Sequence, residues 1–202
     1  MKLLDKCVLT GVMKCWCYNH LILPRIQWQL MIYDNALTYA ERLETIAPTF
    51  LRKWLGVSRN LSSMALYCKQ VKLRLPLDGM TELVKKTAVN SLLQLRESSD
   101  KVVQKSEPVA CCGRKWKPVE AAERAEGRLR FEDISRGQFG RAGLGSLKFR
   151  ASWSKMSSKE RRSELCKAVS AEHDDLCYVR AAQLGVQGSW TSWENVKNRD
   201  LK

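Results

Sequence analysis

The decisive stretch is TYAERLETIAPTFLRKWLG, which runs from Thr38 to Gly56 and contains the signals of one amphipathic helix. Thr38 and Glu41 match the S/T-x-x-E capping box, and Gly56 is a typical C-cap residue. Apolar residues at steps of four and three predict a stripe that faces the core, namely Tyr39, Leu43, Ile46, Phe50 and Trp54, widened by Ala47, Leu51 and Leu55. Pro48 costs ~3 kcal/mol inside a helix, so a kink or a break is expected there.

The last turn of this helix combines two cations with a tryptophan. Arg52 and Lys53 suit the negative end of the helix dipole, and Arg59 follows just beyond the cap. Trp54 lies on the apolar stripe, which predicts a core residue rather than a platform for stacked bases. The cations point away from the stripe and stay available to a ligand.

The rest of the first half also predicts helices. Residues 2–22 form an amphipathic pattern that Leu23-Pro24 should end, and 25–33 is apolar but too short to separate helix from strand. Asn60 should open a helical turn over 61–67. The alternation at 71–77 predicts an extended segment, and Met80 to Leu95 again has helical spacing.

The second half begins with a helix from Pro118 to about Arg130. Residues 134–159 have no acidic residue, and four glycines in their first half predict a flexible basic linker. Ser157 or Ser158, supported by Glu160, should cap a long final helix that ends at two glycines, before a tail with two tryptophans. The predicted fold is mainly α, with a helical domain at 1–107, a short helix and basic glycine-containing linker at 108–157, and a C-terminal helix and tail at 158–202.

Charge points to a polyanionic partner. The chain of 202 residues has 35 Lys and Arg against 21 Asp and Glu, a net +14. The excess is divided evenly, because residues 1–113 have 16 against 9 and residues 114–202 have 19 against 12. Such a distribution favours RNA or DNA as partner. No stretch predicts a membrane span or a signal peptide, so an intracellular protein, nuclear or cytoplasmic, with reduced cysteines is expected.

Catalytic and metal-binding patterns are weak. Cys166, His173 and Cys177 share a helical face but have no obvious fourth ligand, and the sequence has no C-x-x-C motif. Asp174-Asp175 stands in a helical pattern, which predicts a solvated face rather than a polymerase hairpin. The sequence predicts no catalytic residue, no metal and no cofactor.

Several motifs together resemble a known family. LPRIQWQLMIYD, ERLETIAPTFLRKWLGVSRNLSSMALY, LRLPL, GRKWKPVEAAERAEGRLRFEDI, GQFGRAGLGS and GSWTSWENV are similar, in this order, to the region downstream of the catalytic palm in reverse transcriptases of non-LTR retrotransposons. The resemblance implies a helical thumb and a C-terminal extension without the palm carboxylates. Two departures accompany it: Lys-Gln-Val-Lys replaces a glycine-rich lead-in, and neither the palm nor the later Cys/His segment is matched.

The resulting hypothesis is sequence-tolerant binding of RNA or DNA by a non-catalytic fragment of such a reverse transcriptase. The candidate phosphate contacts are Arg52, Lys53, Arg59, Arg136, Arg141 and Arg150. Two alternatives stay open. One is a protein-interaction module that docks through its Trp and Leu faces, and the other is a decayed open reading frame without a function.

Overall fold

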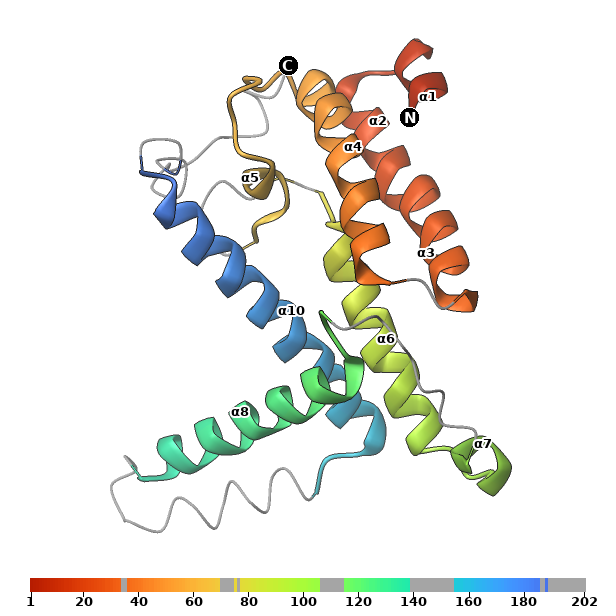
Figure 1. Ribbon diagram of the computed structural model, residues 1–202, viewed down its shortest axis with the longest axis vertical. Helices are drawn as coiled ribbons and strands as arrows, with labels where there is room; N and C mark the ends of the chain where they lie inside the picture. The colour runs from red at the N-terminus through yellow and green to blue at the C-terminus, as the bar shows by residue number, and fades with distance from the viewer. Residues whose placement is uncertain are drawn as a thin grey trace. The chain divides into compact units, whose positions relative to one another are not determined.

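The computed structural model describes residues 1–33, 36–69, 75, 77–105, 115–138, 155–185 and 188, of which residues 31 and 131–138 are described by their backbone alone. The protein is mainly helical, and the described residues contain no β-strand. Two compact units are present (Figure 1). Unit 1 comprises Met1–Val84 and Glu172–Lys202, and unit 2 comprises Lys85–Ala171.

Unit 1 is built around five helical segments before residue 56. They are α1 (Lys2–Lys6), α2 (Gly11–Cys17), the π-helix η1 (Tyr18–Ile22), α3 (Leu23–Ile32) and the long α4 (Leu37–Leu55). The short α5 (Ser63–Tyr67) follows. The predicted single helix over 2–22 begins where expected but is wrong in two places. The helix is interrupted between Lys6 and Gly11, and it does not end at Leu23-Pro24, because η1 continues directly into α3 with Pro24 in the first turn of that helix.

Unit 2 has its own helices. The long α6 (Met80–Arg96) and the C-terminal α10 (Ser158–Gln183) each have residues in both units, whereas α7 (Lys101–Lys105) and α8 (Pro118–Gln138) belong to unit 2. The predictions of α6, of the start of α8 and of the long final helix are confirmed. The predicted end of α8 near Arg130 is wrong, since residues 134–138 continue the helix.

Local capping explains where the helices begin and end. Ser157 and Glu160 form the predicted capping box of α10, with the Glu160 amide 3.3 Å from Ser157 Oγ and the Ser157 amide 2.8 Å from Glu160 Oε2. The box predicted for α4 is not formed, because the helix begins one residue earlier, after Ala36, which makes no side-chain cap. Ser62, rather than Asn60, caps α5.

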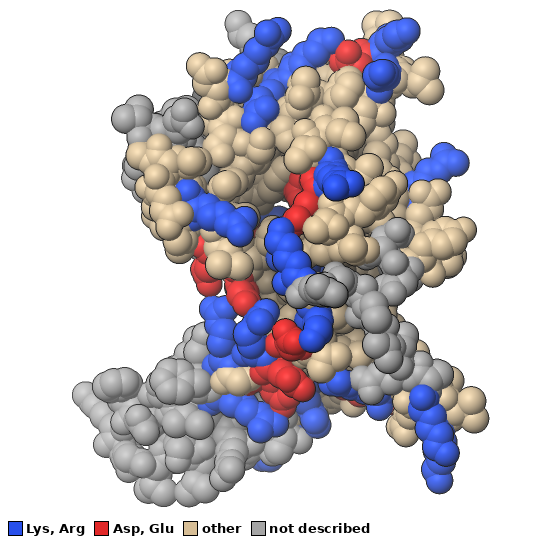
Figure 2. Space-filling view, in the orientation of Figure 1, with Lys and Arg blue, Asp and Glu red and all other residues tan. Residues whose placement is uncertain are grey.

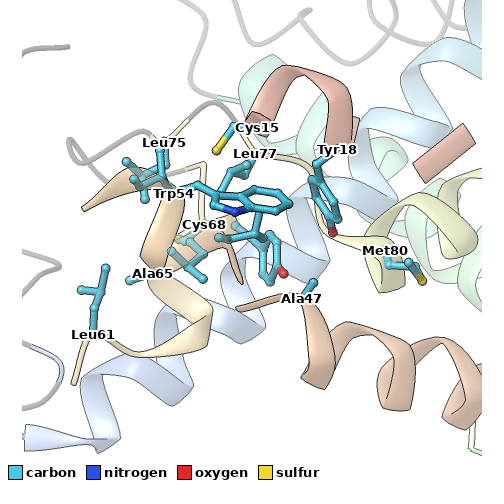
Figure 3. Packing of buried hydrophobic residues seen from close by; sticks show 14 of the residues in the cluster. Cys15, Tyr18, Ala47, Trp54, Leu61, Ala65, Cys68, Leu75, Leu77 and Met80 are labelled. Carbon is cyan, nitrogen blue, oxygen red and sulfur yellow. The ribbon is translucent and has the colours of Figure 1, made fainter. Parts of the chain in front are cut away.

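The core of unit 1 forms where α4 meets the N-terminal helices, α5 and the last turn of α10. Figure 3 shows Trp54 among Cys15, Tyr18 and Leu77. The buried face of α4 consists of Leu37, Ala40, Ala47, Pro48, Leu51, Trp54 and Leu55. Two residues of the predicted stripe are exposed instead, Tyr39 at 50% and Ile46 at 56%. The buried face therefore keeps four of the predicted residues (Ala47, Leu51, Trp54 and Leu55) and extends toward Leu37, Ala40 and Pro48.

Helix α4 continues through Pro48 without the break that the sequence suggested as one outcome. Packing explains the continuity: Pro48 is buried on the core face, where tertiary contacts offset the missing backbone hydrogen bond. The close approach of α2 to the end of α4 also requires glycine at position 11. A Cβ atom on Gly11 would lie 1.7 Å from the carbonyl oxygen of Trp54, so only glycine lets α2 begin against the end of α4.

A second core holds unit 2 together. It consists of Val89, Leu92, Leu93, Ala121, Ala122, Ala125, Leu165 and Val169, with Trp116, Val119, Leu129 and Ala168 packed around it. Small residues on α8 let the helices approach closely, which explains why α8 needs no large apolar stripe. Leu165 and Val169 are buried as predicted for α10, whereas Leu176, Val179 and Leu184, which belong to unit 1, are largely exposed.

Candidate nucleic-acid interface

The end of α4 is the site to which the candidate cations converge. Gly56 adopts the left-handed conformation with φ of 67°, and its amide donates to the Lys53 carbonyl. The Val57 amide donates to the Arg52 carbonyl 3.1 Å away. These bonds satisfy the last carbonyls of the helix and turn the chain back toward it. The predicted C-cap at Gly56 is confirmed.

A pocket of about 620 Å³ lies at this turn. Its lining includes three of the six candidate residues and is completed by small neighbours: Thr49, Arg52, Lys53, Gly56, Val57 and Arg59. Thr49, Arg52, Lys53 and Gly56 follow the i, i+3, i+4, i+7 pattern of one helical face. That face is opposite to the buried side of α4, so the cations point away from the core as the sequence predicted.

The three cations differ in how firmly they are held. Arg52 is half-buried, and its Nε and Nη2 atoms donate to the Leu61 carbonyl and to Ser63 Oγ, each at 2.8 Å. A guanidinium has five N–H donors, so these two bonds fix its position and leave others to meet a ligand. Arg59 is exposed, and none of the described residues bonds to it.

Lys53 has an intramolecular partner that the sequence analysis did not find. Its Nζ atom lies 2.8 Å from Asp5 Oδ2, while the indole N–H of Trp54 donates to Asp5 Oδ1 at 2.9 Å. Both hydrogen bonds lower the pKa of Asp5, with Lys53 the larger cause. Lys53 is thus exposed, as expected of a cation available to a ligand, but it already has an ion-pair partner within the chain. One signal existed: Asp5 is the only acidic residue before Asp34, in a segment that lies 48 residues from Lys53.

The other three candidates belong to unit 2 or lie outside the described residues. Arg136 lies on the backbone of α8, in unit 2. Arg141 and Arg150 lie outside the described residues, as do the tail tryptophans and most of the predicted extended segment at 71–77. Lys and Arg side chains are distributed over the face drawn in Figure 2, with Asp and Glu side chains among them. Of the predicted residues that the structure describes in unit 1, it brings together Arg52, Lys53 and Arg59.

A buried polar cluster occupies another part of unit 1. Lys69 Nζ lies 3.0 Å from Asp78 Oδ1 and 3.1 Å from Glu82 Oε2, while Glu44 accepts hydrogen bonds from the amide and hydroxyl of Thr81. Burial, and then repulsion from Glu82, raises the pKa of Asp174, which is only 7% exposed. The predicted solvated face is therefore wrong for Asp174.

The thiols of this region suit packing rather than chemistry. Cys177 Sγ lies 3.8 Å from His173 Nε2, and burial raises the pKa of Cys177 to about 11. Cys166 instead lies near the Lys86 carbonyl in unit 2, and burial raises its pKa as well. A protonated thiol is a poor nucleophile at neutral pH. Within the described ranges, no group of three or more His, Cys, Asp and Glu residues is placed to hold a metal ion.

Two broader observations complete the picture. Across the part of the chain that the structure describes, no helix is both long and apolar enough to cross a bilayer. Comparison with known proteins gives no match to any protein-family model, curated protein or solved structure.

Proposed function

We propose that this chain binds the phosphate backbone of RNA or DNA without sequence preference, and that the pocket at the end of α4 is one of its contact points. The observation that carries the proposal is the convergence of Arg52, Lys53 and Arg59 on one open pocket. Cations that contact phosphates position a protein on nucleic acid but read no base sequence.

The chemistry of the pocket supports an anionic ligand held by side chains. The helix end presents carbonyls, which are already bonded to the amides of Gly56 and Val57, so the backbone contributes no donors there. Arg52 is fixed in place by Leu61 and Ser63, and a bound phosphate would meet a guanidinium that is already ordered. Lys53 would exchange Asp5 for the phosphate, while the indole N–H of Trp54 still holds Asp5.

The family proposal follows from the sequence motifs. We infer from the R-K-W-L-G signature at 52–56 and the motifs that accompany it that the chain is a non-catalytic part of a retroelement reverse transcriptase. The support from the structure is limited to helical character and to the place of that signature at the end of α4.

The test measures binding of labelled RNA and DNA against salt concentration. Binding through phosphates weakens linearly on logarithmic axes, and removal of one contacting cation should reduce the slope by about one. We expect this for Lys53→Gln and Arg59→Gln. Arg42→Gln is the matched control, because Arg42 is exposed on the same helix and lies about 15 Å along its axis from Arg52, outside the pocket lining. Equal slopes for all three variants would reject the pocket, and no binding at low salt would reject the function.

Asp5 provides a test in the opposite direction. Asp5→Asn releases Lys53 from its ion pair and removes a negative charge beside the pocket, so affinity for nucleic acid should rise. The asparagine oxygen can still accept the bond from Trp54. Weaker binding by Asp5→Asn, in a protein that remains folded by circular dichroism, would contradict a phosphate site at Lys53.

A second candidate function is docking of a protein partner. A groove of about 550 Å³ lies between α3 and α4, lined by Ile26, Gln29, Leu30, Tyr33, Tyr39 and Leu43. Such grooves accept the apolar face of an amphipathic helix. Binding that is insensitive to salt and is lost in Leu30→Asp would favour this alternative over nucleic acid.

A further inference from the structure

We propose that the surface formed by α2, η1 and α3 is a stacking platform for unpaired bases, so that single-stranded nucleic acid is the preferred ligand. This inference rests on the proposed function and specifies its substrate class. The platform consists of Trp16, His20, Pro24, Arg25 and Trp28.

The first observation is an exposed stack that already exists. The rings of Trp16 and His20 lie parallel, with centroids 4.5 Å apart and planes inclined by 12°. The hydrogen bond between His20 Nδ1 and the Trp16 carbonyl holds this arrangement. Trp16 is nevertheless 50% exposed, so His20 covers only part of its surface. A base that stacked on Trp16 and His20 would add a third ring to two rings that are already stacked.

The second observation is that the π-helix brings another tryptophan toward the same face. In an uninterrupted α-helix, twelve residues would separate Trp16 and Trp28 by ~120° around the axis. The π-turn of η1 closes i→i+5 bonds, as the bond from the Leu23 amide to the Tyr18 carbonyl shows, and therefore turns less per residue. Trp28 is rotated back toward Trp16 as a result, and its side chain is 65% exposed.

The third observation is the charge of this surface. Residues 11–33 contain no aspartate and no glutamate, and Arg25 is exposed three residues before Trp28. Lys14 is turned away from this surface and donates to the Asp5 carbonyl 2.9 Å away. Exposed rings beside a cationic side chain, in a segment without an acidic residue, match the combination by which proteins bind single strands regardless of sequence. The charge complementarity therefore favours a polyanion as the occupant.

The experiment compares a fluorescein-labelled oligothymidylate with a duplex of equal length in anisotropy titrations on the full chain. Stacking on one aromatic ring contributes ~1–3 kcal/mol per base. We therefore expect Trp16→Leu/Trp28→Leu to weaken single-strand binding at least about tenfold while the salt slope and the duplex affinity stay unchanged. Trp16→Phe/Trp28→Phe should keep most of the affinity, because phenylalanine still stacks.

The outcomes separate the two proposals. Unchanged single-strand affinity in the leucine pair, or equal losses on single strand and duplex, would overturn the platform while leaving backbone binding at Arg59 intact. Equal single-strand affinity of the phenylalanine pair and the leucine pair would also overturn the platform, because an apolar contact without stacking would then be enough. Absence of any binding by the unmodified chain would reject both proposals. If circular dichroism shows that the leucine pair is unfolded, Trp28→Leu alone makes the same comparison.

Discussion

Trp54 joins the core to the pocket through a single side chain. Its ring is 4% exposed and lies 6.0 Å from the ring of Phe50, while its indole N–H bonds to Asp5 at the surface. The neighbouring Lys53 bonds to the same carboxylate from the exposed side of α4. Asp5 therefore bonds to the buried Trp54 and to the exposed Lys53, and in this way it connects α1 to the last turn of α4.

We expect Trp54→Ala to lower the free energy of unfolding by ~3–5 kcal/mol, because it leaves a large cavity and removes a bonded N–H. Trp28→Ala is the matched control, since Trp28 is 65% exposed and its loss should change stability by less than about 0.5 kcal/mol. Chemical denaturation followed by circular dichroism measures both. Equal effects of the two substitutions would contradict the burial of Trp54.

Two glycine-to-alanine substitutions in helices are expected to change stability in opposite directions. A Cβ on Gly11 would overlap the backbone of Trp54, whereas nothing lies within 4 Å of a Cβ on Gly127 inside α8. Gly11→Ala must therefore separate α2 from α4 and should lower stability by several kcal/mol, of the order seen for overpacked cores or more. Gly127→Ala should raise stability by ~0.5–1 kcal/mol, because alanine favours the helix.

Thermal denaturation monitored by circular dichroism tests the glycine pair. The opposite signs make the comparison sensitive, since the same chemical change is made in both places. A Gly11→Ala protein as stable as the unmodified chain would show that α2 does not pack at the recorded distance. A destabilised Gly127→Ala protein would show that α8 is not a regular helix around that residue.

The elements show which features a single sequence can predict. Helices α4, α6 and α10 were predicted because the apolar spacing of each is helical, and because a terminal glycine also marks the ends of α4 and α10. The core face of α4 was predicted only in part. Ala47, Leu51, Trp54 and Leu55 are buried as expected, whereas Tyr39 and Ile46 are exposed and Ala40 and Pro48 are buried in their stead. Tertiary packing decides which residues of α4 face the core, and the local spacing of apolar residues does not contain that information.

The candidate site, too, was predictable only where its residues are close together in the sequence. Arg52, Lys53 and Arg59 lie near one another in the chain, so a helix end was enough to group them. The partner Asp5 and the anchors at Leu61 and Ser63 required knowledge of how distant segments meet. The π-turn that aligns Trp16 with Trp28 has no sequence signal in residues 18–22, since α- and π-helices use the same residue types.

At the scale of the whole molecule, buried acids predict how stability depends on pH. Burial is the largest cause that raises the pKa of Glu44 and of Asp174 above the ordinary values of 4.5 and 3.8, and repulsion from Glu82 adds to it. A folded-state pKa above that of the unfolded chain means that the folded chain binds more protons. These two groups therefore make the protein more stable as pH falls from neutral toward about 4.5.

Glu44→Gln and Asp174→Asn should each flatten this rise, measured as the free energy of unfolding between neutral pH and about 4.5. Glu160→Gln is the control, and it should leave the rise over this range unchanged. The bonds from Ser157 lower the pKa of Glu160, so the stabilising contribution of this glutamate is lost only as pH falls below its ordinary value of 4.5. Identical pH slopes in the Glu44→Gln and unmodified proteins would contradict the burial of that carboxylate.

The last prediction is that the chain alone does not polymerise nucleotides. Nucleotidyl transfer with two metal ions needs carboxylates that converge on ions ~3.5–4 Å apart. Asp174 and Asp175 are consecutive residues of α10, so their side chains diverge by ~100° around its axis. Asp174 is turned into the buried cluster with Glu82 and Lys69. We therefore expect no incorporation in primer-extension assays with Mg²⁺ or Mn²⁺ on RNA and DNA templates. Incorporation by the purified chain that disappears in Asp174→Asn/Asp175→Asn would overturn this assignment, whereas incorporation that persists in that variant would point to a contaminating polymerase.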